Sequence, residues 1–149
     1  MLMLDSIEDP RNLGSILRTA DATGVDAIII PKRHATGLTS VVAKTSTGAI
    51  DYVPVARVNN LVQTSQMLKK RGYWLFGTDM DGTDYRQWDS NGKTVLVIGN
   101  EGKGISRLLK EQMDQMITLP MVGHVQSLNA SVATGVLLYQ MLDTRNHHK

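Results

Sequence analysis

The stretch Leu96-Val-Ile-Gly-Asn-Glu-Gly-Lys-Gly-Ile105 decides the fold that we expect for this chain. It begins inside an apolar, strand-like run (95–98) and passes through the glycines Gly99, Gly102 and Gly104. A helical pattern starts at Ile105, so the stretch predicts a strand, a tight glycine turn and a helix. Glycine lets the backbone approach a ligand closely, and ligands of open α/β sheets sit at the carboxyl ends of strands. The turn is therefore a candidate binding site, although taken alone an ordinary loop explains it equally well.

Length and composition bound the class of protein. The chain has 149 residues, of which 42% are hydrophobic and 20% charged, so it suits one globular domain with its own core. It has no cysteine, which excludes disulfides and thiolate zinc sites. No apolar run approaches the roughly 18 residues of a membrane span and no signal peptide is visible, so we expect a cytoplasmic protein. The formal net charge is only +2, but the basic groups at 32–34 and 69–71 tolerate an anionic partner.

Strands and helices are predicted to alternate along the chain. Apolar, β-branched runs predict six strands at residues 2–7, 27–30, 53–58, 73–76, 94–98 and 116–120. Helical spacing predicts helices at residues 13–23, 40–47, 61–71, 105–113 and 127–142. This order is typical of an α/β sheet with parallel strand pairs. We expect the acidic segment 79–84 to be a solvated turn, because its glycine comes too early for a calcium-binding loop.

The last predicted helix has the clearest pattern. Ser127 can serve as its N-cap, since a serine hydroxyl accepts hydrogen bonds from the first free N–H groups of a helix. Its apolar residues recur at steps of three and four, which is typical of the apolar stripe of an amphipathic helix. The stripe comprises Leu128, Val132, Gly135, Val136, Tyr139 and Leu142.

Three segments place polar residues and glycines at a strand end just before a helix. They are residues 9–18, 99–104 and 121–129. If the three strands are neighbours, these loops build one pocket. Two common nucleotide sites are disfavoured: the first strand is not followed by the G-x-G-x-x-G of dinucleotide-binding folds, and the glycine turn misses the register of a P-loop.

The same segments carry a resemblance. Residues 9–21, 97–105 and 119–133 resemble, in order, the three motifs of the SpoU (TrmH-like) RNA ribose 2′-O-methyltransferases, and the similarity covers nearly the whole chain. Residues 46–50 and 54–57 are most similar to the branch that methylates a guanosine of 23S ribosomal RNA. Members often carry a small RNA-binding domain ahead of the catalytic one. We therefore expect residues 1–149 to be the catalytic domain alone.

The resemblance implies a fold, a cofactor and an assembly. The fold is the SPOUT type: α/β, with a parallel-rich sheet of about six strands flanked by helices and a C-terminal deep trefoil knot that makes the cofactor pocket. The cofactor is S-adenosyl-L-methionine, the partners are ribosomal RNA and a second copy in a homodimer, and no metal or membrane is involved. The positions that match the family's cofactor site are Gly99, Leu119 and Leu128, with Met121 and Gly104 nearby.

The implied reaction moves a methyl group from a sulfonium to a ribose 2′-hydroxyl. Arg18 is the family-matching catalytic residue. Because a guanidinium keeps its proton, we expect Arg18 to hold phosphate and stabilise the alkoxide rather than act as a lasting base. Asn12 would position Arg18 or the RNA, and Glu101 would hold the glycine loop or orient Arg18. Ser127 and Asn129 would orient substrate and loops. RNA phosphates would be contacted by Arg18, Lys32, Arg33 and Lys103.

Each of these residues also has an ordinary structural explanation. Arg18 could be a solvated helix arginine, Asn12 an N-cap, Glu101 an exposed loop carboxylate and Ser127 a helix cap. The four histidines show no metal-ligand spacing. Two other functions also stay open: a transfer-RNA ribose methyltransferase, and a non-catalytic RNA-binding SPOUT domain. The latter would be expected to lose Arg18 or Asn129, and both are present.

Overall fold

A single sheet forms the centre of the molecule. The computed structural model describes residues 1–33, 37–100 and 102–147. Its strands are β1 (Leu2–Leu4), β2 (Ile28–Pro31), β3 (Val55–Val58), β4 (Trp74–Asp84), β5 (Thr94–Ile98) and β6 (Gln115–Thr118). They form a six-stranded sheet in the order β3-β2-β1-β5-β4-β6, and every neighbouring pair is parallel. The predicted α/β class with a parallel sheet of six strands is confirmed, while the trefoil knot stays a prediction.

Both faces of the sheet are buried, which explains the apolar runs in the sequence. Side chains alternate between the two faces along a strand, so Leu96 and Ile98 point to one core while Val95 and Val97 point to the other. β1 divides in the same way, and all three of its residues are nearly inaccessible to solvent. Parallel sheets covered on both faces are known for such continuous hydrophobic strands.

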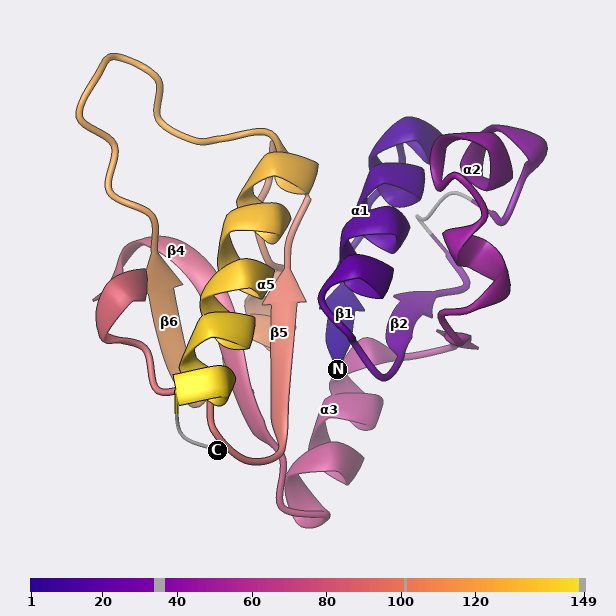
Figure 1. Cartoon of the computed structure of the whole chain (residues 1–149). Helices are drawn as coiled ribbons and strands as arrows, with labels where there is room; N and C mark the ends of the chain where they lie inside the picture. The colour runs from indigo at the N-terminus through magenta and orange to yellow at the C-terminus, as the bar shows by residue number, and fades with distance from the viewer. Residues whose placement is uncertain (34–36, 101, 148–149) are drawn as a thin grey trace.

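Helices cover the two faces (Figure 1). The first core lies beneath α1 (Pro10–Ala22) and α5 (Ala130–His147), which pack side by side. The second lies beneath α3 (Leu61–Lys70) and the short α4 (Arg107–Lys110). α2 (Ser40–Thr45) and the 3-10 turn η1 (Ala49–Asp51) pack against α1. Among the helices of the described residues, none combines the length and the apolarity needed to cross a bilayer.

The segment 79–84 is not the solvated turn that we expected. It belongs to β4, which is 11 residues long and ends at Asp84, where the 3-10 turn η2 (Tyr85–Gln87) begins. Thr78 and Thr83 both pair with Ile117, so the residues between them bulge out of the ladder. Gly82 makes the bulge fit, because a Cβ there would lie 2.6 Å from the carbonyl carbon and oxygen of Met116. The sequence did not predict this part of the strand, because the bulge interrupts the alternation of apolar and polar residues.

The predicted helix at 105–113 is reduced to the four residues of α4. The predicted helix at 127–142 starts later, at Ala130, and extends to His147. Ser127 is therefore not its N-cap. Asn129 takes that role, because its side-chain oxygen accepts hydrogen bonds from the backbone N–H groups of Ser131 (2.9 Å) and Val132 (3.4 Å).

The predicted apolar stripe of α5 is largely exposed. Val132 is 52% exposed, Val136 37% and Tyr139 53%. The core is instead contacted by a second set of apolar residues, which includes Leu137, Leu138 and Met141. The helix is therefore apolar on more than one side, and the stripe that periodicity identifies is not the side that meets this chain's own core.

We predict that Gly82→Ala destabilises the fold by on the order of 1–3 kcal/mol, because its Cβ meets backbone that cannot rotate away. The matched control is Gly123→Ala, whose Cβ would enter open space and which should change stability by less than about 1 kcal/mol. Denaturant unfolding followed by circular dichroism measures both. Equal stability of the two variants would show that the bulge tolerates a side chain.

Candidate functional site

One cavity lies at the carboxyl ends of β5 and β6, beside the middle of β4. It has a volume of about 350 Å³, which is in the range of small-molecule sites. Residues from the β4 bulge, the glycine loop after β5 and the segment between β6 and α5 line it. They are Thr78, Asp79, Met80, Ile98, Gly99, Asn100, Gly102, Gly104, Ile117, Thr118, Leu119, Met121, Gln126, Ser127, Leu128, Ala130 and Ala133.

The glycine loop doubles back on itself. Asn100 and Gly104 exchange backbone hydrogen bonds of 3.0 and 2.8 Å, which closes the loop as an isolated antiparallel bridge. A Cβ on Gly99 would overlap the backbone of Gly104 and Ile105, so only glycine fits there. Gly104 has a φ of +69°, a conformation that side chains disfavour. The two glycines thus keep backbone groups, rather than side chains, at the cavity wall.

Asn100 and Asp5 hold this loop in place. The Asn100 side-chain oxygen accepts from the N–H groups of Gly102 (2.9 Å) and Lys103 (3.2 Å), and its amide nitrogen donates to the Ser6 carbonyl (2.9 Å). The Asp5 carboxylate, 7% exposed as a residue, accepts from the Ser106 N–H at 2.8 Å. The end of β1 therefore supports both sides of the loop after β5. Our sequence reasoning missed both residues; the adjacency of β1 and β5 was the missing information.

The β4 bulge forms a second wall. Asp79 lines the cavity, and its carboxylate makes an ion pair of 2.5 Å with the Lys110 ammonium at the end of α4. The hydrogen bond that Lys110 donates lowers the pKa of Asp79 below its usual value. The Met80 carbonyl accepts from the Thr118 hydroxyl at 3.2 Å, which ties the bulge to β6. Asp79 and Met80 were also missed, because we interpreted the segment 79–84 as a turn.

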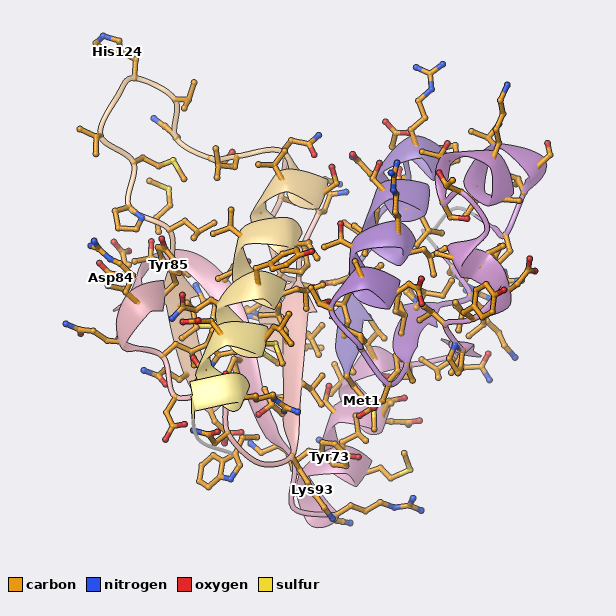
Figure 2. All side chains as sticks on the ribbon, viewed as in Figure 1. Met1, Tyr73, Asp84, Tyr85, Lys93 and His124 are labelled. Atoms are coloured by element: carbon orange, nitrogen blue, oxygen red, sulfur yellow. The ribbon has the colours of Figure 1, made fainter. Side chains whose placement is uncertain are left out.

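The five residues assigned by resemblance to the cofactor all line this one cavity: Gly99, Gly104, Leu119, Met121 and Leu128. Ser127, assigned to the reaction, lines it as well. Segments separated by some twenty residues in sequence therefore meet where the resemblance placed a pocket. The loop that carries Met121 and Leu128 extends away from the body, with His124 directed outward near its tip (Figure 2).

Asn12 and Asn129 meet at the junction of α1 and α5. The Asn129 amide donates to the Asn12 side-chain oxygen at 3.3 Å. Asn12 is not an N-cap, which was its ordinary structural explanation. α1 begins two residues earlier, and its N-cap is Asp9, which accepts from the Arg11 N–H at 2.8 Å. It lies inside the helix and is buried. The hydrogen bond between the two asparagines therefore links α1 to the start of α5.

The basic residues assigned to RNA are elsewhere. Arg18 is exposed on α1, Lys32 and Arg33 are exposed after β2, and Lys103 is exposed in the glycine loop. They are not among the described residues that line the cavity. Glu101 and His34 lie outside the described residues, as does His148. Within the described parts of the chain, no group of three or more histidine or acidic side chains could hold a metal ion.

A cavity with these walls suits a flat, partly apolar molecule. Leu119, Met121 and Leu128 offer apolar surface, and the glycine loop offers backbone N–H and C=O groups at close range. Asp79 supplies a charge at one wall. Such a site can bind and orient a small ligand.

Comparisons with known proteins agree with this arrangement. The model of the SpoU rRNA Methylase family matches residues 1–139. A protein of Bacillus subtilis named as a TrmH family tRNA/rRNA methyltransferase, YacO, is 58% identical over 146 residues, which are 97% of this chain and 59% of that protein. A relative in Staphylococcus saprophyticus, named in the same way, is 56% identical over 148 residues, 99% of this chain and 59% of its own length. The chain thus spans about 59% of the length of these curated relatives.

Solved structures share the fold. The SpoU methyltransferase AviRb of Streptomyces viridochromogenes, crystallised with AdoMet, has a TM-score of 0.90 and 31% identity, covering 98% of this chain and 60% of that one. The A. aeolicus TrmH/SpoU tRNA modifying enzyme has a TM-score of 0.90 and 32% identity, covering 99% of this chain and 76% of that one. Because one family model accounts for residues 1–139 and these structures superpose on nearly the whole chain, the protein belongs to the SpoU rRNA Methylase family.

Proposed function

We propose that this chain catalyses the transfer of a methyl group from S-adenosylmethionine to the 2′-hydroxyl of an RNA ribose. The observation that carries the proposal is the convergence of the five family-matching positions on one cavity. Family membership adds support, since the curated relatives are named as RNA methyltransferases and AviRb was crystallised with AdoMet.

The cavity has the chemistry to hold the cofactor. Leu119, Met121 and Leu128 would pack against the adenine, whose polar edge would be left to backbone groups. Gly99 and Gly104 would allow the backbone to approach the ligand closely. We further propose that the chain segments around this cavity form the trefoil knot of the SPOUT fold, because the loops 99–104 and 119–129 both contribute to it.

RNA would approach from the same edge of the sheet. Every strand pair is parallel, so the carboxyl ends of β2 and β5 lie at one edge. Lys32 and Arg33 follow β2 and Lys103 follows β5, and all three are exposed. Exposed cations at the edge that holds the cavity are suited to contact RNA phosphates.

In the proposed reaction, the cofactor supplies the activated methyl group and the protein orients the two reactants. A ribose hydroxyl is a weak nucleophile until its proton is lost or strongly polarised. Arg18 would hold the phosphate beside the target nucleotide and stabilise the developing alkoxide, because its guanidinium keeps its charge. Asn12 would position Arg18 or the RNA, and Ser127 and Asn129 would orient the substrate and the loops. Glu101 would hold the glycine loop or orient Arg18.

The finer proposal concerns the RNA. We propose a guanosine of 23S ribosomal RNA, on the resemblance of residues 46–50 and 54–57 to that branch. A transfer RNA is the second candidate, because the curated relatives are named tRNA/rRNA methyltransferases and the A. aeolicus structure is titled a tRNA modifying enzyme.

We also propose a homodimer. The stripe of α5 formed by Val132, Val136 and Tyr139 is exposed in the single chain. Water-exposed apolar stripes of this kind are suited to association, and a second copy presents the same stripe.

The cofactor assignment predicts that Leu128→Ala weakens S-adenosylmethionine binding roughly 5- to 30-fold, about 1–2 kcal/mol, because apolar contact with the adenine is lost. Isothermal titration calorimetry measures the affinity. Val125→Ala is the matched control: it lies in the same loop, is 65% exposed and should bind as the parent does. Unchanged binding by Leu128→Ala would remove this residue from the cofactor site.

The reaction is tested with tritiated cofactor and two unmethylated substrates, 23S ribosomal RNA and transfer-RNA transcripts. Label recovered as 2′-O-methylguanosine from 23S RNA supports the full proposal, whereas label in transfer RNA alone selects the second candidate. RNA binding without methyl transfer would favour the non-catalytic SPOUT domain.

In this assay, Arg18→Ala should lower methyl transfer by about 100-fold or more while leaving cofactor affinity unchanged, because Arg18 is exposed outside the cavity lining. Arg18→Lys should recover only part of the activity, since an ammonium lacks the bidentate fork of a guanidinium. Full activity of Arg18→Lys would contradict the bidentate role.

The dimer proposal predicts that Val136→Glu yields monomers in sedimentation analysis, because the charge would be buried in the middle of the stripe. Val122→Glu, which places the same charge on a loop residue that is 99% exposed, should remain dimeric. A monomeric parent protein would refute the proposed assembly.

A further inference from the structure

The β4 bulge brings an acidic side chain to the cavity. Thr78 and Thr83 share Ile117 as their partner on β6, so the residues between them leave the ladder. Asp79 and Met80, the first two residues of the bulge, are both cavity-lining. A strand without the bulge would keep Asp79 in register with β6, so the irregularity is what delivers this carboxylate to the site.

Asp79 is the only ionisable residue among the described residues that line the cavity. The others are glycines, apolar residues, amides and hydroxyls. A carboxylate in a lining that is otherwise uncharged can accept a hydrogen bond from a cationic group of a ligand.

The carboxylate is ionised and held in one orientation. Its Oδ2 receives the Lys110 ammonium at 2.5 Å, and its Oδ1 accepts from the Met80 N–H at 2.6 Å. The hydrogen bond from Lys110 lowers the pKa of Asp79, so the group is charged at neutral pH. Lys110 ends α4 and is not among the described lining residues, so this ion pair ties the β4 wall to an element outside the cavity.

The carboxylate keeps room for a further donor. The two carboxylate oxygens can together accept four hydrogen bonds. Asp79 is engaged by three donors, which are the Lys110 ammonium and the backbone N–H groups of Met80 and Asp81. The amino-acid end of S-adenosylmethionine carries an α-ammonium with three N–H donors. Its sulfonium is also positive but has no hydrogen to donate, so the α-ammonium is the better match to a carboxylate.

We propose that Asp79 accepts a hydrogen bond from the α-ammonium of the cofactor, with Lys110 as the residue that positions the carboxylate. This inference rests on the proposed function, because it assumes that the cavity binds S-adenosylmethionine. It assigns the β4 wall to the amino-acid end of the cofactor and leaves the wall formed by Leu119 and Leu128 to the adenine.

The test compares three ligands by calorimetry on the whole chain: S-adenosylmethionine, S-adenosylhomocysteine and 5′-methylthioadenosine. The first two carry the α-ammonium, whereas the third keeps adenine, ribose and sulfur but lacks the amino-acid end. Asp79→Asn should weaken binding of the first two by about tenfold or more and by equal factors, and leave 5′-methylthioadenosine within about twofold of the parent.

Asp81→Asn is the matched control, because Asp81 belongs to the same bulge, is exposed and is not among the described lining residues. It should bind all three ligands as the parent does. Lys110→Met should weaken the two amino-acid ligands more than 5′-methylthioadenosine, and Lys110→Arg should restore them, since the guanidinium can still hold the carboxylate.

The outcomes separate the alternatives. Equal loss for 5′-methylthioadenosine would mean that Asp79 only shapes the cavity, which overturns the proposal. Unchanged affinity of Asp79→Asn for all ligands overturns it as well. A loss confined to S-adenosylmethionine would point to the sulfonium instead of the α-ammonium and likewise overturn it. If the folded parent binds none of the three ligands, the proposed function fails, which is a different result from a failure of Asp79.

Discussion

The contact of Gly99 with the backbone of Gly104 and Ile105 is the constraint on which the site depends. Because Gly99 has no Cβ, β5 can end directly against its own returning loop. The returning loop is then held by Asn100 from within and by Asp5 and Ser6 from the end of β1. The pairing of β1 with β5 in the middle of the sheet thus fixes the loop that forms one wall of the cavity. A bulkier residue at Gly99 would displace this loop rather than simply narrow the pocket.

The cavity lining and the exposed surface at the same sheet edge carry different charged groups. Within the described cavity lining, Asp79 is the sole ionisable group, and a basic partner outside that lining holds it. Exposed cations such as Lys32, Arg33 and Lys103 lie instead on the surface at the same sheet edge. Such a division suits two ligands of opposite character: a compact molecule recognised by shape and by few polar contacts, and a polyanion attracted at longer range.

Sequence reasoning predicted the strand positions, the α/β class and the family well, because buried parallel strands have dense apolar runs and the glycine motif is local. It failed where the answer depended on distant residues. Gly82 and Asp79 look like turn residues until β6 pairs beside them. Residues such as Asp5 act through a contact with Ser106 that is 101 positions away in sequence.

The last helix shows a different reason for failure. A periodic apolar stripe indicates which residues share a side of α5, but it does not say which apolar side meets this chain's own core. Leu137 and Leu138 are buried, while Val132 and Val136 are not. The structural alternative for Asn12, an N-cap, is excluded because Asp9 and Pro10 start α1 earlier than the apolar pattern does. Local patterns therefore placed the elements, and tertiary contacts decided the roles.

The order of strands in the sheet also determines when each strand can pair during synthesis. β1, near the start of the chain, lies between β2 and β5, and Leu2 pairs with both Ile28 and Leu96. During synthesis from the N-terminus, β1 therefore waits with one open edge until β5 has left the ribosome. One face of the sheet stays uncovered longer still, because α5 follows all six strands in the sequence. The growing chain thus carries an apolar, unpaired surface until β5 and α5 have been made, so aggregation is a greater hazard during synthesis than after folding.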